Sequence, residues 1–441
     1  MANRLVFAVN NDVAVTKSLN SNLVLTLLEL VLASAEPARP QFITTIITVS
    51  GPGVMNQSVL ETKSTSPQPN TSALRSLARN LGVDAVIAMS PENFVYTSGV
   101  HLMSVSHLRR QAFAVLPATA EPIALVATTE RSQMVDGSWI KDIRTYTEFA
   151  NDPADALADV LIELGKNCGT IGIDLNYLPA RTHARLASRL PNVRLIDTNQ
   201  NLAAIRAVKV RGEIELLERV TRQTHRAVLD AMSAARLGET ERVMANRIAE
   251  AIVNDGADEC LMIFGSGPRS SNIHACATDR IPLKSEIVRL DVGGRYGAWG
   301  SDFARTYSTG APTALQRETY GKLWDLHTST ISMIRPGMAA EEPFFFCKDH
   351  AEKLGLNFKM VWVGHGFGIE THEFPMIRPG EKTKLEVGMV FNTEPMVTDA
   401  EGAMYHLEDL FVVTERGTRL LTLGFGPREI PIIGEQIRMQ E

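Results

Sequence analysis

Two segments in the second half of the chain each combine a strand, a turn and a second strand with two acidic residues at fixed spacing. The first, EIVRLDVGGRYGAWGSDFARTY at 286–307, has two runs rich in β-branched and aromatic residues that are joined through glycines. A two-residue loop at Tyr296 and Gly297 would place Asp291 directly opposite Asp302. Their side chains would then lie on one face of the hairpin, with Cβ atoms about 5 Å apart.

The second segment, VFNTEPMVTDAEGAMYHLEDLFVV at 390–413, allows the same argument. A loop centred on Glu401 with an odd number of residues would pair Glu394 with Glu408 across the two strands. The sequence therefore predicts two hairpins, each of which contributes one pair of carboxylates.

Four carboxylates in one cavity repel one another and lose hydration, so some stay protonated unless cations neutralise them. The simpler alternative is that each acid faces water on a half-exposed strand. Apolar neighbours argue against that alternative, because they indicate strands in the interior. These neighbours are Val288, Leu290, Val292, Val390, Phe391, Leu407 and Leu410. Together with His365, the four acids make a hard donor set that suits a pair of divalent metal ions.

The chain resembles the pita-bread metallopeptidase family, which includes Xaa-Pro aminopeptidase, Xaa-Pro dipeptidase (prolidase), methionine aminopeptidase and creatinase. The resemblance covers the chain from about Thr71 to the C-terminus. The motifs that carry it are LDVGGRYGAWGSDFART, GHGFGIETHE, NTEP and LED. It implies an α/β N-terminal domain of the creatinase type, followed by an α+β pita-bread catalytic domain.

The resemblance also implies a role for each ligand. Asp302 and Glu408 would bridge two metal ions. Asp291 would bind one of the ions, and His365 and Glu394 would bind the other. Glu394 would also be the general base, because it touches the attacking water. Hydrolysis of a C–N bond is the expected reaction.

Two further histidines are candidate catalytic residues. His274 lies seventeen residues before Asp291, where the family keeps a substrate-binding histidine, and His372 lies seven residues after His365. Both would donate hydrogen bonds to the substrate carbonyl, to the oxyanion or to the leaving nitrogen. For a single histidine a structural role is more common, but the spacing of these two relative to the ligand motifs favours the catalytic role.

Two positions depart from the family pattern. Val361, four residues before His365, stands where many proline-specific members carry another histidine that helps to hold the substrate. His406, two residues before Glu408, replaces an arginine that commonly pairs with the first aspartate, so that pairing would be weaker or pH-dependent here. Neither change affects a predicted ligand, but both make an ordinary Xaa-Pro substrate less certain.

Three functions therefore stay open. The first is a dinuclear metal-dependent hydrolase that cleaves the amide bond before proline in Xaa-Pro dipeptides or N-terminal Xaa-Pro peptides. The second is a non-peptidic C–N hydrolase of the same fold, acting on a small amide or guanidino compound. The third is a non-catalytic interaction protein, which the complete ligand set disfavours. Manganese is the expected metal because the ligands are mostly oxygen, with cobalt, zinc and iron as alternatives.

The composition agrees with a soluble two-domain enzyme. The chain has 441 residues, more than one hydrophobic core usually serves, and 44% of them are hydrophobic. The net charge of −6 argues against nucleic acid or a membrane as partner and favours a small peptide or small amide substrate. The resemblance implies a homodimer, in which the N-terminal domain covers the active site and limits the length of the substrate.

The cysteines bear on the cellular compartment. Cys168, Cys260, Cys276 and Cys347 are scattered without CxxC spacing, which indicates neither a zinc knuckle nor a disulfide framework. Buried free thiols in a reducing compartment, the cytoplasm, are therefore expected. Cys276 lies close to His274 in sequence, but no nearby residue would activate it as a thiolate.

The chain is expected to have three parts: an N-terminal extension and linker at 1–70, an α/β domain at 71–201 and the catalytic domain at 202–441. The extension contains a Leu-rich stretch at 22–33, followed by a polar tract that is typical of a disordered linker. Three alternatives fit the Leu-rich stretch: a secretion signal, a short helix, or an upstream segment with true initiation at Met55. It is too short to span a bilayer.

Other segments of the chain have simpler interpretations. The amphipathic pattern at 72–82 predicts a helix that ends at a glycine cap. Met244 and the run Phe344–Phe346 are expected in the core. Tyr96 and His101 either face the cleft or pack ordinarily, and ordinary packing is the more common situation.

Overall fold

The computed structural model describes residues 3–7, 15–19, 67–437 and 439. The chain divides into two units, Met1–Thr65 and Ser66–Glu441. In the first unit, strands β1 (Asn3–Phe7) and β2 (Val15–Leu19) form an antiparallel pair. The Leu-rich stretch at 22–33 and most of the polar tract lie outside the described residues.

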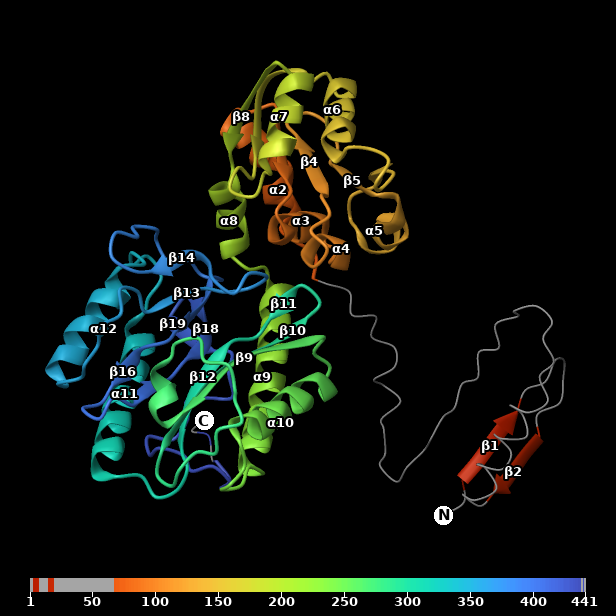
Figure 1. The fold of residues 1–441 in the computed structure, drawn as a ribbon. Coiled ribbons are helices and arrows are strands. Elements are labelled where there is room, and N and C mark those ends of the chain that lie inside the picture. Colours follow the sequence, from red (N-terminus) through yellow and green to blue (C-terminus); the bar gives the residue numbers. More distant parts are fainter. Residues whose placement is uncertain (1–2, 8–14, 20–66, 438, 440–441) are drawn as a thin grey trace. The chain divides into compact units, whose positions relative to one another are not determined.

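The second unit begins with an α/β domain on a six-stranded mixed sheet with the strand order β6-β5-β4-β3-β7-β8. Its strands are β3 (Ala85–Ala88), β4 (Phe113–Pro117), β5 (Ile123–Ala127), β6 (Asp142–Tyr146), β7 (Cys168–Ile173) and β8 (Asn192–Asp197). Every residue of β3, β4 and β5 is buried, which explains why these strands are continuous apolar runs in the sequence. Figure 1 shows this sheet and its helices in orange to yellow-green.

The helices of this domain are α2 (Thr71–Leu81), α3 (Pro91–Ser98), α4 (Met103–Ser106), α5 (Arg131–Gly137), α6 (Pro153–Glu163) and α7 (Ala180–Arg189), with a 3₁₀ turn η2 (Thr128–Glu130). The helix predicted at 72–82 is confirmed as α2. The Asn70 side chain caps its first turn, and Gly82 ends it at a φ of 65°. Its buried side chains are Leu74, Leu77 and Ala78, spaced three and one residues apart along one face.

Helix α8 (Asn199–Ala207) follows β8 and leads into the second domain. The expected boundary between residues 201 and 202 falls inside this helix. Immediately after α8, Val208 forms an isolated β-bridge with Met389, so the chain enters the second domain at the edge of the strands that carry the candidate site.

The second domain contains two main antiparallel sheets and one short pair. In the first sheet, β10 (Ile287–Tyr296) pairs with β9 (Glu259–Ser266), β11 (Trp299–Gly300) and β12 (Phe303–Ser308). The second has the order β14-β13-β15-β18-β19, with bounds Glu373–Ile377, Gly364–Gly366, Val390–Thr393, Asp409–Thr414 and Gly417–Leu420. The short pair is β16 (Met396–Thr398) with β17 (Met404–His406).

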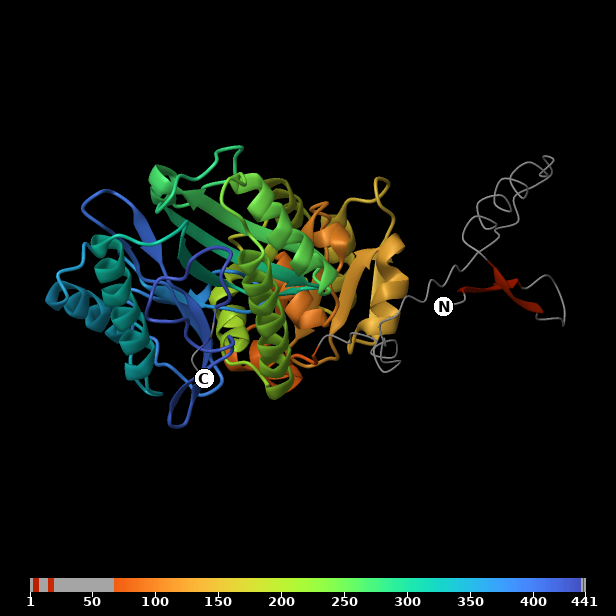
Figure 2. The same ribbon diagram turned by 90° about the horizontal axis from the view of Figure 1, so that it is seen from below.

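Two helix pairs lie on the two sides of these strands, as Figures 1 and 2 show. One pair is α9 (Arg211–Ser233) and α10 (Glu241–Asn254), in green, and the other is α11 (Ala314–Met333) and α12 (Glu342–Lys353), in teal to light blue. Each pair has its own apolar core: the first packs on β9, β10 and β12, and the second on β14, β15 and β18. A 3₁₀ turn, η3 (Gly267–Ser271), follows β9.

The aromatic run in α12 corrects one expectation. Met244 and Phe344 are buried as predicted, but Phe345 is 44% exposed and Phe346 is only partly buried. Successive residues of a helix point about 100° apart, so three neighbours cannot all face one core. Hydrophobicity alone predicts that all three phenylalanines are buried. The period of the helix allows only some of them to face the core.

The cysteines correct another expectation. All four are free, but only Cys347 is buried, whereas Cys168 and Cys276 are exposed and Cys260 is partly buried. Among the helices that the structure describes, none is both long enough and apolar enough to cross a membrane.

Candidate metal centre and active site

The first hairpin has a different register from the one predicted. Asp291 lies opposite Ala304, and the pairing of Tyr296 with Trp299 leaves Gly297 and Ala298 as the loop. The predicted loop at Tyr296 and Gly297 is therefore wrong. Gly297 has a φ of 63°, the left-handed conformation that the first residue of a type II′ turn adopts, and a tyrosine would adopt it only with strain.

The two aspartates nevertheless share one face of this hairpin. The change in register moves the residue that faces Asp291 by two positions, and side chains alternate with a period of two, so Asp302 stays on the same side. The backbones also come close here, because a Cβ on Gly293 would lie 2.1 Å from the carbonyl oxygen of Ser301. A glycine at this position lets the strand that carries Asp291 approach the segment that carries Asp302.

The second hairpin has the predicted register. Thr393 pairs with Asp409 on one side of the candidate acids, and Met396 pairs with His406 on the other side. Glu394 and Glu408 lie between these two ladders and face each other. The loop at residues 399–403 is centred on Glu401, so the prediction from an odd loop length is confirmed.

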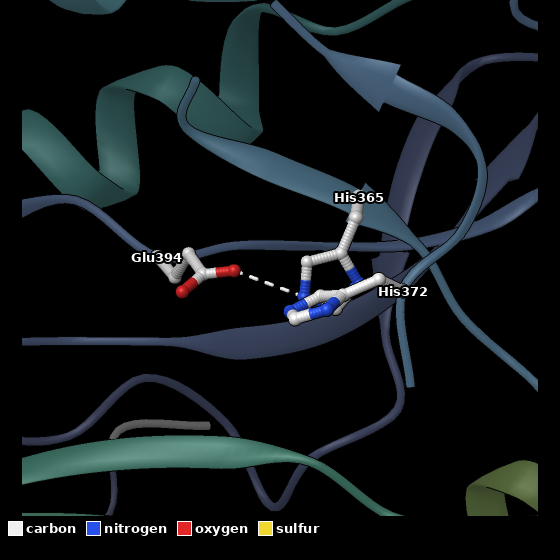
Figure 3. Close-up of side chains that lie close together, drawn as sticks. All are labelled: His365, His372 and Glu394. Atoms are coloured by element: carbon white, nitrogen blue, oxygen red, sulfur yellow. Dashed lines mark ion pairs between the residues drawn. The ribbon is translucent and has the colours of Figure 1, made fainter. Parts of the chain in front are cut away.

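His365 lies in β13, between β14 and β15. Its Nδ1 is 3.0 Å from the carbonyl oxygen of Gly366 and donates to it, which leaves the lone pair on Nε2. Nε2 lies 2.9 Å from Oε1 of Glu394. Figure 3 shows this approach, and it places the ring of His372 against that of His365, with centroids 4.3 Å apart.

All the predicted site residues except His365 line a cavity of about 210 Å³. Its polar lining consists of His274, Arg289, Asp291, Ser301, Asp302, Thr371, His372, Glu394 and Glu408. Its apolar lining includes Leu261, Met262, Ile263, Ile273, Trp362 and Met396. His274 and His372 are exposed, so they reach the cavity from its open side.

Within this site, possible ligand atoms approach to 4.8 Å or less in three overlapping groups. The groups are His365 with His372 and Glu394, then Asp302 with His365 and Glu408, and then Glu394 with His406 and Glu408. In the described part of the chain these groups bring together four of the five predicted ligands. The fifth, Asp291, lies in the wall of the same cavity and is half-buried.

The pKa values of three acids in this site differ strongly from those of carboxylates in water. Burial raises the pKa of Asp302, Glu394 and Glu408 well above the usual range, and repulsion from neighbouring carboxylates, Asp291 among them, raises it further. Burial lowers the pKa of His365 to about 4, so its imidazole is neutral at pH 7. Without added positive charge, the acids therefore hold their protons to a higher pH than carboxylates in water do.

The site residues fit divalent metal ions. Oε1 of Glu394 is buried without a hydrogen-bond partner, although Nε2 of His365 lies only 2.9 Å away. Two ligand atoms that bind the same ion approach each other in this way. Carboxylate oxygens with neutral imidazole nitrogens form a donor set for manganese, cobalt, zinc or iron.

Asn392 supports two of these ligands, and sequence analysis missed it. Its side-chain amide donates to Glu408, its Nδ2 lies 3.1 Å from Nε2 of His365, and its Oδ1 accepts from the backbone N–H of His365 at 3.2 Å. The residue pairs with His365 across β13 and β15. Only this cross-strand pairing, which the sequence does not display, could have revealed the contact.

Arg289, in β10, supports the loop before His274. The side chain is fully buried; its Nε donates to the carbonyl of Ser270 at 2.9 Å. Its Nη2 donates to the carbonyls of Asn272 and Ile273 at 2.6 and 2.7 Å. An arginine in the middle of an apolar strand was the available sign in the sequence, because a buried guanidinium must find several acceptors.

Glu373 holds the loop that carries His372. One carboxylate oxygen accepts from the backbone N–H groups of Ile369 and Glu370, at 3.0 and 3.2 Å. The other lies 2.8 Å from Nζ of Lys209, and both side chains are buried. The segment that leaves α8 therefore connects directly to the loop of a candidate catalytic residue.

A second cluster of buried charges lies directly behind the cavity. Oδ1 of Asp409 accepts from Arg305 at 2.6 Å and from Thr422 at 2.7 Å, and Oδ2 lies 3.0 Å from Nε2 of His327. Burial alone would raise the pKa of Asp409, but Arg305 and His327 lower it below its usual range. Arg305 also donates to the carbonyl of Glu408 at 2.5 Å, which fixes the backbone of that candidate ligand.

Several positions considered in the sequence do not line the cavity. Tyr96 is buried in α3 and its hydroxyl accepts from the backbone N–H of Asn70, and His101 is half-buried beside Ser106. Ordinary packing is therefore the outcome for both. Val361, at the position of the missing histidine, is 74% exposed and lies outside the lining residues.

The comparisons with known proteins agree with this fold. The sequence matches Metallopeptidase family M24 over residues 215–415 and the Creatinase/Prolidase N-terminal domain over residues 71–208. The first match contains all five predicted ligands. The second covers the α/β domain and ends just after α8.

Individual relatives agree with these matches. The chain is 32% identical over 259 residues to the probable dipeptidase PepE of Mycobacterium tuberculosis strain H37Rv, covering 58% of this chain and 68% of PepE. It is 29% identical over 269 residues to the Xaa-Pro dipeptidase of Pyrococcus furiosus, covering 60% and 76%. The solved Xaa-Pro dipeptidase from Bacillus anthracis superposes with a TM-score of 0.74 at 22% identity, covering 82% of this chain and 98% of that one.

The fold is thus that of the pita-bread metallohydrolases, with a creatinase-type domain preceding the catalytic domain. On the family match and the identity to PepE, the chain belongs to metallopeptidase family M24.

Proposed function

We propose that this chain is a dinuclear metal-dependent hydrolase that cleaves the amide bond before proline, in Xaa-Pro dipeptides or in peptides with an N-terminal Xaa-Pro. The observation that carries the proposal is the convergence of four carboxylates on one cavity, with His365 beside Glu394 and with His274 and His372 at the open side. The names of the relatives, Xaa-Pro dipeptidase and probable dipeptidase, support the substrate class.

In this proposal, Asp291, Asp302, His365, Glu394 and Glu408 would hold the metal ions. Two divalent cations bound there would lower the pKa of the attacking water and polarise the substrate carbonyl. Manganese is the proposed metal because the donor set is mostly oxygen.

The side chains of the protein then move the protons and stabilise the developing charge. Glu394 accepts the proton of the attacking water, because it lies at the cavity with an oxygen that has no hydrogen-bond partner. His274 and His372 donate hydrogen bonds to the carbonyl oxygen as it gains negative charge, and to the leaving nitrogen. Burial lowers the pKa of His372 to about 4, so it acts as a neutral donor at pH 7.

The small cavity and its apolar wall favour a short substrate. Leu261, Ile273 and Trp362 offer contacts to an apolar side chain or to a proline ring. We further propose a cytoplasmic homodimer, in which the α/β domain limits substrate length.

The test is release of proline from a set of Xaa-Pro dipeptides by the chelated protein, with and without added Mn²⁺. Metal-dependent release supports the proposal. Metal binding without release of proline would overturn the Xaa-Pro assignment and would point to a small non-peptide amide or guanidino compound.

A further inference from the structure

His406 is a buried imidazole for which the proposed mechanism has no role. It is 0% exposed, and neither ring nitrogen has a hydrogen-bond partner in the described structure. Its backbone is held on both sides by Thr306, whose hydroxyl donates to the carbonyl at 2.9 Å and accepts from the N–H at 2.8 Å. A buried polar group without a hydrogen-bond partner destabilises a protein, so this arrangement requires an explanation.

The strand register directs His406 towards the candidate ligands. His406 faces Met396, and Glu408 faces Glu394, in one continuous register. Alternate residues of a strand share a face, so these four side chains lie on the same side of the hairpin. Met396, Glu394 and Glu408 all line the cavity, and His406 is covered beside them.

Glu394 lies between two imidazoles. Its Oε1 is 2.9 Å from Nε2 of His365, and its Oε2 is 3.8 Å from Nε2 of His406. Possible ligand atoms of His406, Glu394 and Glu408 all lie within 4.8 Å of one another. Two donors bound to one divalent ion lie about 3 to 3.5 Å apart, so a shift of a few tenths of an ångström would bring His406 into a shared coordination sphere.

We propose that His406 is an additional metal ligand, which binds through Nε2 beside Glu394 and Glu408. The donor set then contains four carboxylates and two imidazoles, and it takes a borderline divalent cation such as Zn²⁺, Co²⁺ or Fe²⁺ more readily than a set with one imidazole. This inference rests on the proposed function, because it assumes that the cavity holds metal ions.

The surroundings of His406 suit a ligand. Neither of its ring nitrogens has a hydrogen-bond partner in the described structure, and a neutral imidazole has a lone pair for a cation. Glu394 and Glu408, whose possible ligand atoms lie within 4.8 Å, provide the negative charge that the cation needs.

The decisive measurement counts imidazole ligands in the full-length chain. The chelated protein is loaded with two equivalents of Co²⁺ and examined by X-ray absorption at the cobalt edge. We expect two imidazoles per two cobalt ions in the wild type and one in His406→Phe. The control His183→Phe, which removes an exposed histidine of α7, should retain two.

One imidazole per two cobalt ions in the wild type would overturn the assignment of His406 while leaving the proposed function intact. Failure to bind cobalt at all would overturn both. Should His406→Phe fail to fold, His406→Gln replaces it, and a count of two imidazoles in that variant would overturn the assignment, because His372 could then be the second imidazole ligand.

Affinity provides a second readout. Replacing His406 with Gln should weaken Zn²⁺ binding by more than about 10-fold and should weaken Mn²⁺ binding less, because imidazole contributes more to zinc sites than to manganese sites. Equal losses for the two metals would contradict the assignment.

Discussion

Glu408 and Asp409 are neighbours in the chain, yet they belong to two opposite kinds of buried charge. Glu408 faces the cavity among other carboxylates, and burial and repulsion raise its pKa. Asp409 faces the other way, towards Arg305, His327 and Thr422, and its pKa is lowered. Two consecutive residues are therefore an acid that lacks neutralising charge and an acid that has it.

The difference shows which cluster needs a partner from outside the protein. The Asp409 cluster contains its own cation and hydrogen bonds, so it contributes to the fold without added ions. The cavity cluster has four acids, and Arg289, the nearest arginine in its wall, uses three hydrogen bonds on the loop before His274. Cations that enter the cavity would supply the missing charge, as they would in a metal-dependent hydrolase.

The largest expected effect separates the chemistry of the cavity from its fold. Glu394→Gln should lower turnover by about 10³-fold or more, because it removes both a charged ligand and the proposed base. The protein should remain folded, since Gln retains the shape of the side chain. Initial rates on an Xaa-Pro dipeptide, with circular dichroism, test this. Glu401→Gln, an exposed acid in the loop of the same hairpin, is the control and should keep full activity. Unchanged turnover in Glu394→Gln would refute the mechanism.

The matching change in the other cluster should act on stability instead. Arg305→Met leaves Asp409 buried without its main cation and should lower the free energy of unfolding by about 3–5 kcal/mol. The control is Arg428→Met, which breaks a partly exposed pair with Asp325 and should cost about 1 kcal/mol or less. Urea denaturation of the chelated protein measures both. Similar losses for the two variants would mean that the Asp409 cluster is not a self-neutralised unit.

A smaller effect is expected from a change at His274, which lines the cavity. His274→Ala should lower turnover by about 10²-fold through loss of a hydrogen bond to the developing oxyanion, while metal content stays the same. Cys276→Ser, in the same loop but outside the cavity lining, should behave like the wild type. Loss of metal in His274→Ala would instead make the residue part of the metal site.

The two clusters should also respond to pH with opposite signs. The raised pKa values of Asp302, Glu394 and Glu408 mean that these acids stabilise the metal-free fold below about pH 4, and that this contribution is lost as the pH rises. The lowered pKa of Asp409 means that its contribution is present above about pH 4 and is lost as the pH falls.

Unfolding measured at about pH 5.5 and about pH 8 isolates the contribution of the cavity acids, because the contribution of Asp409 is constant above about pH 4. Mn²⁺ at 100 times its dissociation constant should add about 2.7 kcal/mol at the higher pH and less at the lower pH, where protons compete for the ligands. Burial raises the pKa of Glu213 to about 7. Because Glu213 contributes equally to the stability of the metal-free and the Mn²⁺-bound protein, its contribution cancels when the two are compared. An equal gain in the free energy of unfolding at both pH values would contradict the competition between protons and Mn²⁺ for the ligands.

The register arguments show what sequence could predict about the site. The hairpin at 390–413 was predicted correctly, because an odd loop centred on Glu401 fixes every pair. The hairpin at 286–307 was predicted with the wrong loop, because the conformational need of Gly297 was not weighed against that of Tyr296. The prediction that Asp291 and Asp302 share a face was still correct, because side chains alternate along a strand with a period of two residues and the register differs by two.

What sequence could not predict depends on contacts between distant strands. Asn392 touches His365 and Glu408 only because β15 lies between β13 and β18. The direction of His406 towards Glu394 likewise follows from the pairing of β16 with β17 beside the second sheet. The family resemblance identified the position of His406 as unusual, but only the fold shows which acid it faces.

The central claim is that the cavity carboxylates hold two catalytic metal ions. Its most direct test is titration of the chelated chain with Mn²⁺, followed by both calorimetry and proline release, with Glu408→Gln in parallel. The account predicts two ions bound per wild-type chain, activity that appears as they bind, and loss of both tight binding and activity in the variant. Proline release that persists in the chelated protein, or unchanged binding in Glu408→Gln, would contradict it.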